Sequence, residues 1–593
     1  MRRSRRVVNA NPSGAQGSSA CERAARRQEA ARRALQLAAT LCDPAAWRLP
    51  GFLLAEGSAV AAVIDSRPDR RTNAAALATL GAITVLAALL RCSALDYGGG
   101  VYAAHPDELN VVTAIDAARA GKLSPFHVAY GGGFVYPLST FVRTVELAFG
   151  TPAASPANDA TDYLGQPYAE YLHARLWSAT LAVLTVALTG VVGARVAGWP
   201  AGLLAAAMVT AAPLAVLNAH LAKADSACAL GSVLVLGALA LRGGSRRRIL
   251  ALGLAAGLAL SVKYHSGPLL AVAIALLALP ATRPSVRAAH LAGGVAIAVL
   301  AALALNAFWI WAPAESLAHF RALVRSQFAY VRAPWFAGLA VDPLVYHATI
   351  SLRFGCGLVF ALLALPALLF AVFSDATLRL FVLVVVGELA VLAFNPLTLS
   401  RNFLPVLPTL AVLVGHLLAR VADRLGRYRL AFLVLAGVAL VGGPLRTSVK
   451  LVELLRADDT RTLLQRWIAE RLPANATFMS GDGKAGAPRY GLPGSGIGLA
   501  QGEHRMVPFD LDRPRPSPAY LVWYEHPLPF SQAPLPPAAA QLEVAAEFDP
   551  FDGPVDAVFD VYDAFYVPLA RAAHVVRPGP HIRVLALPDQ PPA

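Results

Sequence analysis

Long apolar runs dominate this sequence and limit it to folds that a lipid bilayer can hold. Charged residues make up only 15% of the 593 residues and hydrophobic residues 56%, whereas soluble domains carry roughly 25% charge. A helix needs about 20 apolar residues to cross a bilayer. We count eleven such runs, several of them short, at 74–90, 176–194, 199–217, 226–241, 249–262, 267–280, 289–311, 354–373, 378–394, 403–419 and 430–445. The sequence therefore predicts a polytopic α-helical membrane protein with about 11 transmembrane helices, and it excludes a soluble enzyme or a disordered chain.

The composition changes twice along the chain and divides it into three parts. Residues 1–73 hold 13 arginines and six acidic residues among small polar ones, which is typical of a basic cytoplasmic tail without a packed core. Residues 74–445 carry the apolar runs. Residues 446–593 contain many prolines and short alternating runs such as 557–562 and 582–587. This pattern predicts a soluble α+β domain at the carboxy terminus.

The arginines predict which loops face the cytoplasm. With the amino terminus inside, the inner loops collect twelve arginines and the short outer turns carry three basic residues, as expected because inner loops are enriched in Lys and Arg. This count favours two short helices in 249–280 over one kinked span, which would invert everything that follows. Eleven spans then place the two long loops, 96–175 and 312–353, and the carboxy-terminal domain outside the cytoplasm. We expect a multi-pass protein of the plasma (inner) membrane.

The charge and the cysteines exclude other classes of protein. The net charge of +14 does not indicate nucleic-acid binding, because the basic residues gather in the amino-terminal tail and in short loops between apolar runs. The five cysteines lie far apart and none forms a CxxC pair. They therefore support neither a zinc site nor a disulfide framework.

Two adjacent carboxylates, Asp107 and Glu108, follow His105 and Pro106 in the first long loop. Carboxylates beside a membrane are costly unless they have cationic partners or a proton to transfer. A general base contributes typically ~10²- to 10⁴-fold when an acceptor hydroxyl can reach it. A simpler interpretation is that Pro106 and Asp107 begin a helix, since acidic residues in a first turn interact favourably with the helix dipole. The spacing alone leaves both interpretations open.

Further polar residues gather on the same side of the membrane. One outer turn carries Asn218, His220, Lys223 and Asp225, a second carries Lys263, Tyr264 and His265, and three helices begin near Arg175, Arg353 and Arg401. Cations around a carboxylate pair would stabilise the charge that develops on a departing lipid phosphate. Solvated turns and snorkelling lysines would produce the same pattern.

Several blocks of sequence, taken in order, resemble a known family. The runs HPDE (105–108), GKLSPF (121–126) and VYP (135–137) resemble the first outer loop of the GT-C class of polyprenyl-phosphate-dependent glycosyltransferases, the superfamily of protein O-mannosyltransferases and the aminoarabinose transferase. The likeness continues through HARLWSA (173–179), AHLAKAD (219–225), GLALSVKY (257–264), RNFLPVLP (401–408) and DTRTLLQRWIAERLP (459–473). The late stretches DAFYVPL (563–569) and RPGPHI (577–582) are similar to the carboxy-terminal domain of some bacterial members.

The resemblance implies a GT-C type fold and an inverting transfer of a hexosyl or pentosyl unit. The donor would be a polyprenyl-phosphate-linked sugar and the acceptor a hydroxyl of a protein, lipid or glycan of the cell envelope, on the outer face of the membrane. Asp107 matches the family's base and Glu108 its second acidic residue, so the resemblance implies that both are catalytic residues. Candidates for contacts with the donor phosphate are Arg175, Lys223, Lys263 and Arg401, and further site candidates are His105, His220, Asp225, Tyr264 and His265. The resemblance leaves dependence on a divalent metal open. The sequence departs from it at Asn402, where many relatives place a tyrosine.

Two alternatives come from neighbouring classes of protein. A lipid-linked glycan polymerase or ligase would use an acceptor that is itself lipid-linked. A non-enzymatic exporter of lipid-linked glycan would place charges near the bilayer midplane, often on broken helices in paired halves. In this sequence Glu388 is the one acidic residue deep within a predicted span. A single such residue does not form a transport pathway.

Overall fold

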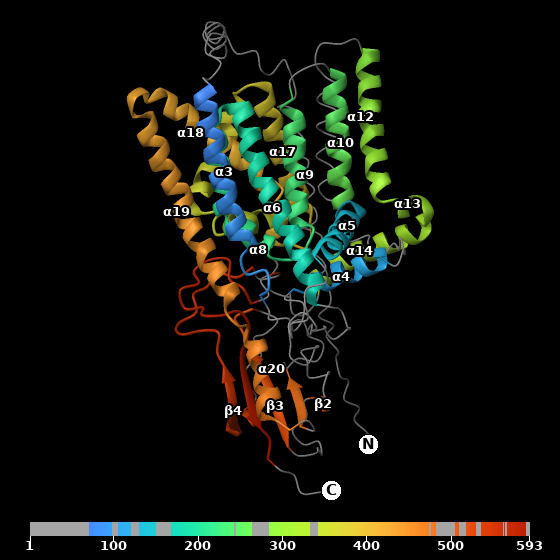
Figure 1. The fold of residues 1–593 in the computed structure, drawn as a ribbon, viewed down its shortest axis with the longest axis vertical. Helices are drawn as coiled ribbons and strands as arrows, with labels where there is room; N and C mark the ends of the chain where they lie inside the picture. The colour runs from blue at the N-terminus through green and yellow to red at the C-terminus, as the bar shows by residue number, and fades with distance from the viewer. Residues whose placement is uncertain are drawn as a thin grey trace, which may run out of the picture.

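The computed structural model combines a bundle of membrane helices with a small sheet domain (Figure 1). The helices stand side by side along the long axis, and the sheet lies beyond one end of the bundle. The predicted fold class, a polytopic helical protein with a carboxy-terminal α+β domain, is confirmed. The structure describes residues 70–97, 105–119, 130–149, 168–241, 245–263, 284–332, 342–395, 397–473, 476–481, 505–508, 518–528, 535, 537–560, 563 and 566–588.

Ten of the eleven predicted apolar runs lie on helices, and the run 267–280 lies outside the described residues. The helices of the bundle are α3 (Arg70–Cys92), α6 (Tyr168–Ala197), α7 (Trp199–Ala211), α8 (Pro213–Ala219), α9 (Asp225–Leu239), α10 (Ser245–Val262), α12 (Pro284–Leu305), α16 (Leu358–Val372), α17 (Ala376–Phe394), α18 (Val406–Arg424) and α19 (Arg429–Arg456).

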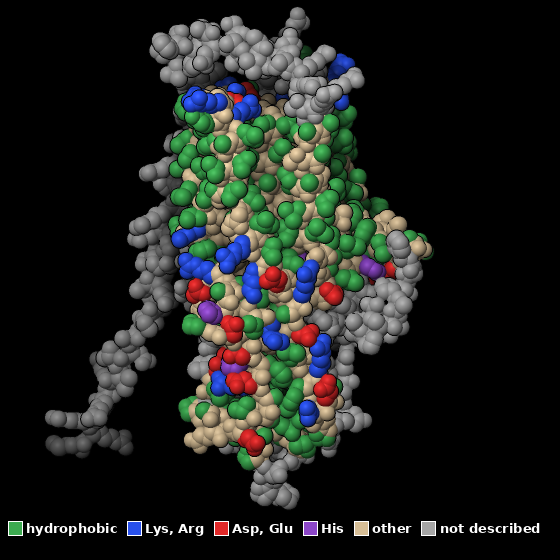
Figure 2. Space-filling view, turned by 60° about the vertical axis from the view of Figure 1, so that its left-hand side comes forward, with side chains coloured by type: hydrophobic (Ala, Val, Ile, Leu, Met, Phe, Trp, Pro, Cys, Tyr) green, Lys and Arg blue, Asp and Glu red, His purple; other side chains and the backbone are tan. Residues whose placement is uncertain are grey.

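The outer surface of the bundle is apolar. Six helices of the described residues are long and apolar enough to cross a membrane, and α7 with α8 adds a seventh as a pair bent by 60°. The helices α9 and α16 are apolar but shorter. Leu362, Leu365, Leu430 and Leu435 are each more than 60% exposed, and Figure 2 shows a belt of hydrophobic side chains with charged side chains above and below it. Such a belt is the surface that lipid tails would cover.

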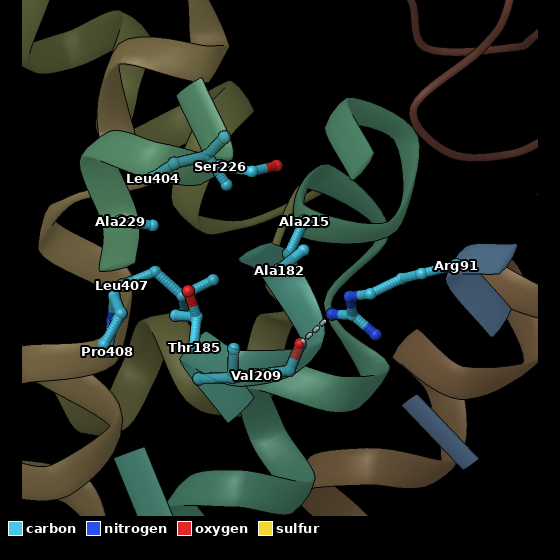
Figure 3. Close-up of a pocket in the computed structure, with 10 residues that line it drawn as sticks. All are labelled: Arg91, Ala182, Thr185, Val209, Ala215, Ser226, Ala229, Leu404, Leu407 and Pro408. Atoms are coloured by element: carbon cyan, nitrogen blue, oxygen red, sulfur yellow. Dashed lines mark hydrogen bonds between the residues drawn. The ribbon is translucent and has the colours of Figure 1, made fainter. Parts of the chain in front are cut away.

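The bend between α7 and α8 begins at Pro213, which has no N–H to donate to the carbonyl of Val209. Inside a bilayer that carbonyl needs another partner. Arg91 on α3 supplies it: Nη2 donates to Val209 O at 2.7 Å and Nη1 to Thr210 O at 3.1 Å, and Figure 3 shows the first of these bonds. Ser448 on α19 donates to the next carbonyl at 2.8 Å. Two other helices therefore stabilise the bend.

Helices α10 and α12 pack closely and in parallel. A Cβ atom on Gly253 would lie 2.8 Å from the carbonyl oxygen of Gly294, and one on Gly257 would collide with the carbonyl oxygen of Ala298. The later residue of α10 thus faces the later residue of α12, so the two helices run in the same direction. The residues that connect α10 to α12, including the predicted run 267–280, lie outside the described residues, so the separation of 249–262 and 267–280 into two spans stays a prediction.

Further helices lie in the segments between the helices of the bundle. They are α4 (Pro106–Arg119), α5 (Gly132–Phe149), α13 (Phe308–Trp311), α14 (Pro313–Arg332), α15 (Pro343–Tyr346), the π-helix η4 (His347–Leu352) and the 3-10 helices η5 (Ser400–Phe403) and η6 (Gly426–Tyr428). Helices α4 and α5 lie near the end of the bundle that faces the sheet domain (Figure 1).

The start of α5 is held against the ends of α10 and α12. Gly131 N donates to Val262 O at 3.0 Å, and Gly132 N donates to the side-chain oxygen of Asn306 at 2.8 Å. A Cβ atom on Gly131 would overlap the carbonyl oxygen of Ser261. A larger residue at this position would therefore push α5 away from the bundle.

The carboxy-terminal domain is a five-stranded mixed sheet with one helix against it. Its elements are α20 (Thr460–Arg471), β1 (Thr477–Gly481), β2 (Arg505–Pro508), β3 (Ala519–Glu525), the 3-10 helix η9 (Ala539–Gln541), β4 (Glu543–Phe548) and β5 (His581–Ala586). The strand order is β2-β1-β3-β5-β4, with β1 parallel to both neighbours and β5 antiparallel to both of its own. Leu464 and Ile468 of α20 pack against Phe478 and Val522 in the core.

One predicted strand is wrong. The run 582–587 matches β5, whereas the described residues of 557–562 form a single bridge, between Val558 and Ala570. The reason is a competing polar contact. Asp560 accepts hydrogen bonds from the hydroxyl of Tyr346 at 2.6 Å and from the backbone N–H of Ser400 at 2.9 Å, so this segment docks on the helical bundle.

Reporter fusions test the topology. A fusion after Arg248, at the arginine-rich start of α10, should report the cytoplasm, and a fusion after Ala457, where α19 ends, should report the opposite side, because the inner loops hold the arginines. Paired reporters, each active on one side of the membrane only, give the measurement. The same side for both fusions would contradict the eleven-span arrangement.

Candidate active site

The sequence HPDE forms the start of α4 as a capping box. His105 precedes the helix, and its Nδ1 accepts the backbone N–H of Asp107 at 3.0 Å. In return, Glu108 Oε2 accepts the backbone N–H of His105 at 3.2 Å, and Pro106 occupies the first helical position, which suits proline. Because Nδ1 of His105 acts as acceptor, the ring proton lies on Nε2. The simpler interpretation of this motif as a helix start is therefore correct, although it explains only part of its contacts.

Glu108 forms a closed and fully buried ion pair with Arg175 of α6. Arg175 Nε and Nη2 donate to the two carboxylate oxygens at 2.8 and 2.9 Å, and Nη1 donates to the carbonyls of Leu95 and Tyr97. Glu108 also accepts the backbone N–H of Ala222 at 2.9 Å. This pair joins α4, α6 and the segments that follow α3 and α8. Because both carboxylate oxygens are bonded and buried, the geometry indicates a structural role for Glu108, which differs from the catalytic role that the resemblance implies.

Asp107 faces a different set of groups. Its Oδ2 lies 2.7 Å from Nη1 of Arg401, which sits in η5 next to the start of α18. The hydroxyl of Tyr130, before α5, also hydrogen-bonds with Asp107. The Asp107 side chain is 25% exposed, while Glu108 is completely buried. Of the two adjacent carboxylates, Asp107 is the one that a substrate can reach.

Asp563 of the carboxy-terminal domain lies at the centre of the same cations. Its Oδ1 accepts from Nε2 of His105 at 2.7 Å and lies 3.1 Å from Nη1 of Arg401, and its Oδ2 accepts from Nζ of Lys223 at 3.2 Å. Lys223 is fully buried and Asp563 is 7% exposed. The sheet domain thus contributes a side chain to the end of the helical bundle.

A third carboxylate completes the group. Asp225, the first residue of α9, lies 2.7 Å from Nζ of Lys263 and 3.8 Å from Nε of Arg401. Three carboxylates and three cations therefore meet at one place, and we call Asp107, Asp225, Asp563, Lys223, Lys263 and Arg401 the charged cluster. Buried charges need this kind of pairing, because each charge loses its hydration.

The charges shift the pKa values of their neighbours. Burial raises the pKa of Asp107, but the nearby positive charges, of which Arg401 is the largest contributor and Lys223 another, together outweigh burial and hold that pKa well below its ordinary value. The pKa of Asp563 is lowered in the same way, against burial, by Arg401 and Lys223. Burial lowers the pKa of Lys223, and the nearby charge of Arg401 lowers it further. Both carboxylates are therefore ionised at neutral pH.

The structure brings together most of the residues that the sequence singled out, namely His105, Asp107, Lys223, Asp225, Lys263 and Arg401. Arg175 is a correction: its donors are used by Glu108 and by backbone carbonyls, and it is fully buried, so it does not serve as a phosphate ligand. His220 also has a structural role, because its ring nitrogens contact the carbonyls of Val216 and Ser93. Tyr264 and His265 lie outside the described residues.

Sequence reasoning missed two members of the site, Asp563 and Tyr130. Asp563 is the first residue of the block DAFYVPL, which resembles the carboxy-terminal domain of some bacterial members of the family. Its position 458 residues from His105 hid its place among the site residues. Tyr130 stands before the glycine run that begins α5, and nothing in its local sequence marks it.

A metal ion does not fit the described residues. His105, Asp107 and Asp563 each place a potential ligand atom within 4.8 Å of the others, and these donor types suit a divalent ion. However, Nη1 of Arg401 lies 2.7 Å from Asp107 and 3.1 Å from Asp563, and Nζ of Lys223 lies 3.2 Å from Asp563, so these two cations already neutralise both carboxylates. A further cation would have to displace them against charge repulsion, and we assign no step to a metal.

A small cavity inside the bundle is separate from the charged cluster. Figure 3 shows it between Arg91, Thr185, Val209, Ser226 and Leu407. Its volume of about 20 Å³ admits about one water molecule. It is too small for a sugar or a lipid chain.

Neither a comparison with protein-family models nor one with curated protein sequences finds a match. Solved structures similar to this chain include ArnT from Cupriavidus metallidurans in the apo state, with 14% identity, a TM-score of 0.44, and coverage of 87% of this chain and 98% of that chain. The same protein bound to undecaprenyl phosphate is similar with 14% identity, a TM-score of 0.42, and coverage of 75% of this chain and 92% of that chain. Another is the archaeal oligosaccharyltransferase AglB from Archaeoglobus fulgidus, in complex with an inhibitory peptide and a dolichol-phosphate, with 13% identity and a TM-score of 0.43. The match covers 67% of this chain and 58% of that chain, so this chain spans less than two thirds of AglB. These are similarities to GT-C type structures, the class that the sequence resembles.

Exchange of Glu108 should affect folding more than chemistry. In Glu108→Gln the buried guanidinium of Arg175 loses its counter-charge, and breaking a buried ion pair from one side costs about 3 to 5 kcal/mol. We expect less inserted protein and a lower melting temperature in detergent. The matched control is Glu146→Gln on α5. Normal stability of Glu108→Gln would contradict the structural role of the pair.

Proposed function

We propose that this protein is an inverting glycosyltransferase, which moves a sugar from a polyprenyl-phosphate carrier to an acceptor hydroxyl on the outer face of the membrane. The observation that carries the proposal is the position of the Asp107 carboxylate, 2.7 Å from Arg401 at the end of the helical bundle. The same cluster contains the fully buried Lys223 and the partly exposed Lys263. A base beside a group of cations is what an acceptor hydroxyl and a phosphate leaving group require.

In the proposed reaction, Asp107 takes the proton of the acceptor hydroxyl. The hydroxyl oxygen attacks the anomeric carbon of the sugar from the side opposite the phosphate, and a new glycosidic bond forms. The bond between the anomeric carbon and the phosphate oxygen breaks, and its electron pair leaves with the polyprenyl phosphate. One displacement of this kind inverts the anomeric configuration.

The two partly exposed cations of the charged cluster are the best candidates for the phosphate contact. Lys263 is 17% exposed and Arg401 is 11% exposed, whereas Lys223 is fully buried. The Nε and Nη1 atoms of Arg401 lie near carboxylates without a hydrogen bond of good geometry among the described residues. A phosphate oxygen would supply one, since guanidinium groups bind phosphate through two parallel N–H donors.

Contact between Arg401 and the phosphate would also activate Asp107. While Arg401 faces Asp107, its charge keeps the pKa of that carboxyl low, and a weak base accepts a proton poorly. A phosphate that neutralises Arg401 removes this effect. The base then gains strength at the moment the donor is in place.

The distribution of charge does not favour a transport pathway. The charged cluster lies at one end of the bundle, around the starts of α4, α9 and α18 and the end of α10. An exporter would place ionisable groups along the depth of the membrane. The polymerase or ligase alternative uses the same donor chemistry and differs in its acceptor.

Replacement of the base should abolish most of the transfer. Asp107→Asn keeps the shape of the side chain and removes its ability to accept a proton, so turnover should fall by about 10²-fold or more. Membranes with equal amounts of inserted protein are incubated with radiolabelled polyprenyl-phosphate sugars, and the labelled product is counted. Asp116→Asn, on the same helix, is the control. Full turnover of Asp107→Asn with saturating donor and acceptor would exclude the assignment.

Loss of a phosphate contact should change donor kinetics and leave insertion intact. Lys263→Met and Arg401→Met should each lower kcat/KM for the donor by about tenfold or more, the effect of one charge-assisted contact. The measurement varies donor concentration at equal inserted protein. Arg353→Met, which loses a cation–π contact with Phe354 outside the cluster, is the matched control. Wild-type donor dependence in both variants would place the phosphate elsewhere.

A further inference from the structure

Asp563 differs from the rest of the charged cluster in its origin. The other five members belong to residues 74–445, whereas Asp563 belongs to the carboxy-terminal domain and lies 340 residues from Lys223 in the chain. The proposed reaction assigns it no chemical step. Its burial among three cationic or proton-donating side chains nevertheless requires an explanation, because an isolated buried carboxylate is costly.

Two neighbouring carboxylates dock this segment on the bundle in different ways. Asp560 accepts from the hydroxyl of Tyr346 and from the backbone N–H of Ser400, and Ser400 directly precedes Arg401. Asp560 therefore fixes the backbone of the segment beside η5. Asp563, three residues later in the chain, contacts the side chain of Arg401.

The contacts of Asp563 fix both of its carboxylate oxygens and leave Oδ1 beside Arg401. Lys223 Nζ holds Oδ2 at 3.2 Å and His105 Nε2 holds Oδ1 at 2.7 Å, and both of these partners are buried. Oδ1 also lies 3.1 Å from Nη1 of Arg401. A long arginine side chain loses considerable rotamer freedom when it is ordered, and a rigidly held carboxylate beside it reduces that loss when a ligand binds.

We propose that Asp563 is a positioning residue for the donor site: it holds the Arg401 guanidinium in the orientation that binds the donor phosphate. This inference rests on the proposed function. It assigns the carboxy-terminal domain a direct part in donor binding. It also explains why a carboxylate occupies a place beside cations that would otherwise repel one another.

The test is a double-mutant cycle with Arg401, measured as donor kcat/KM at equal inserted protein. Asp563→Asn alone should lower this value roughly tenfold, mainly through a higher donor KM, because the contact it supports is a charge-assisted one. In the Arg401→Met background the same change should have less than about a twofold further effect, since the group it positions is gone. The acceptor KM should stay at the wild-type value. Asp556→Asn, an exposed carboxylate of the same segment, is the matched control.

The possible outcomes separate the inference from the proposed function. A wild-type protein that transfers no sugar from any polyprenyl-phosphate donor overturns both. An active wild type with normal donor kinetics in Asp563→Asn overturns the inference alone, as does an equal loss in the wild-type and Arg401→Met backgrounds. If Asp563→Asn does not fold, Asp563→Glu replaces it, because this variant keeps the charge and shifts the carboxylate. A donor KM of Asp563→Glu between those of the wild type and Arg401→Met supports the inference. A wild-type donor KM together with a lowered melting temperature overturns it.

Discussion

Charge balance in the buried cluster is the constraint on which the rest of the site depends. Asp107, Asp225 and Asp563 match the charges of Lys223, Lys263 and Arg401, and every one of these side chains has an opposite charge within 4 Å. Removal of any charge leaves another without its counter-charge in a poorly hydrated place. In the proposed reaction a bound phosphate would add a negative charge, so the ion pairs would have to rearrange when a donor enters. Arg401, which faces all three carboxylates, is the member best placed to change partner.

The geometry of α4 explains how two adjacent carboxylates acquire different roles. Successive residues of an α-helix point about 100° apart around its axis, so Asp107 and Glu108 face different neighbours. Glu108 caps the helix and pairs with Arg175, which fixes the helix to the bundle. Asp107 then faces the cluster from a rigid support. A catalytic group needs such support, since small displacements cause large losses in rate.

Local pattern predicted the parts of this structure that local forces decide. The apolar runs marked most of the membrane helices, and the motif around Asp107 marked both a helix start and the approach to the site. The sequence did not reveal that Arg175 is enclosed by backbone carbonyls, because burial depends on how α3 and α6 pack. It also did not reveal Asp563, whose partners lie hundreds of residues away. The wrong strand at 557–562 has the same origin, because a docking contact replaced local pairing.

The arginine at the end of the first membrane helix also constrains how the protein is made. Arg91 binds carbonyls that lie 118 and 119 residues later in the chain, so it enters the membrane well before its partners are synthesised. Until then, the side chain can reach water by extending toward the nearby surface, as arginines near helix ends do. Completion of α7 and its bend would draw Arg91 into the bundle. The first helix should therefore change its depth or tilt during synthesis, and the bend at Pro213 would set the stage at which it becomes fixed.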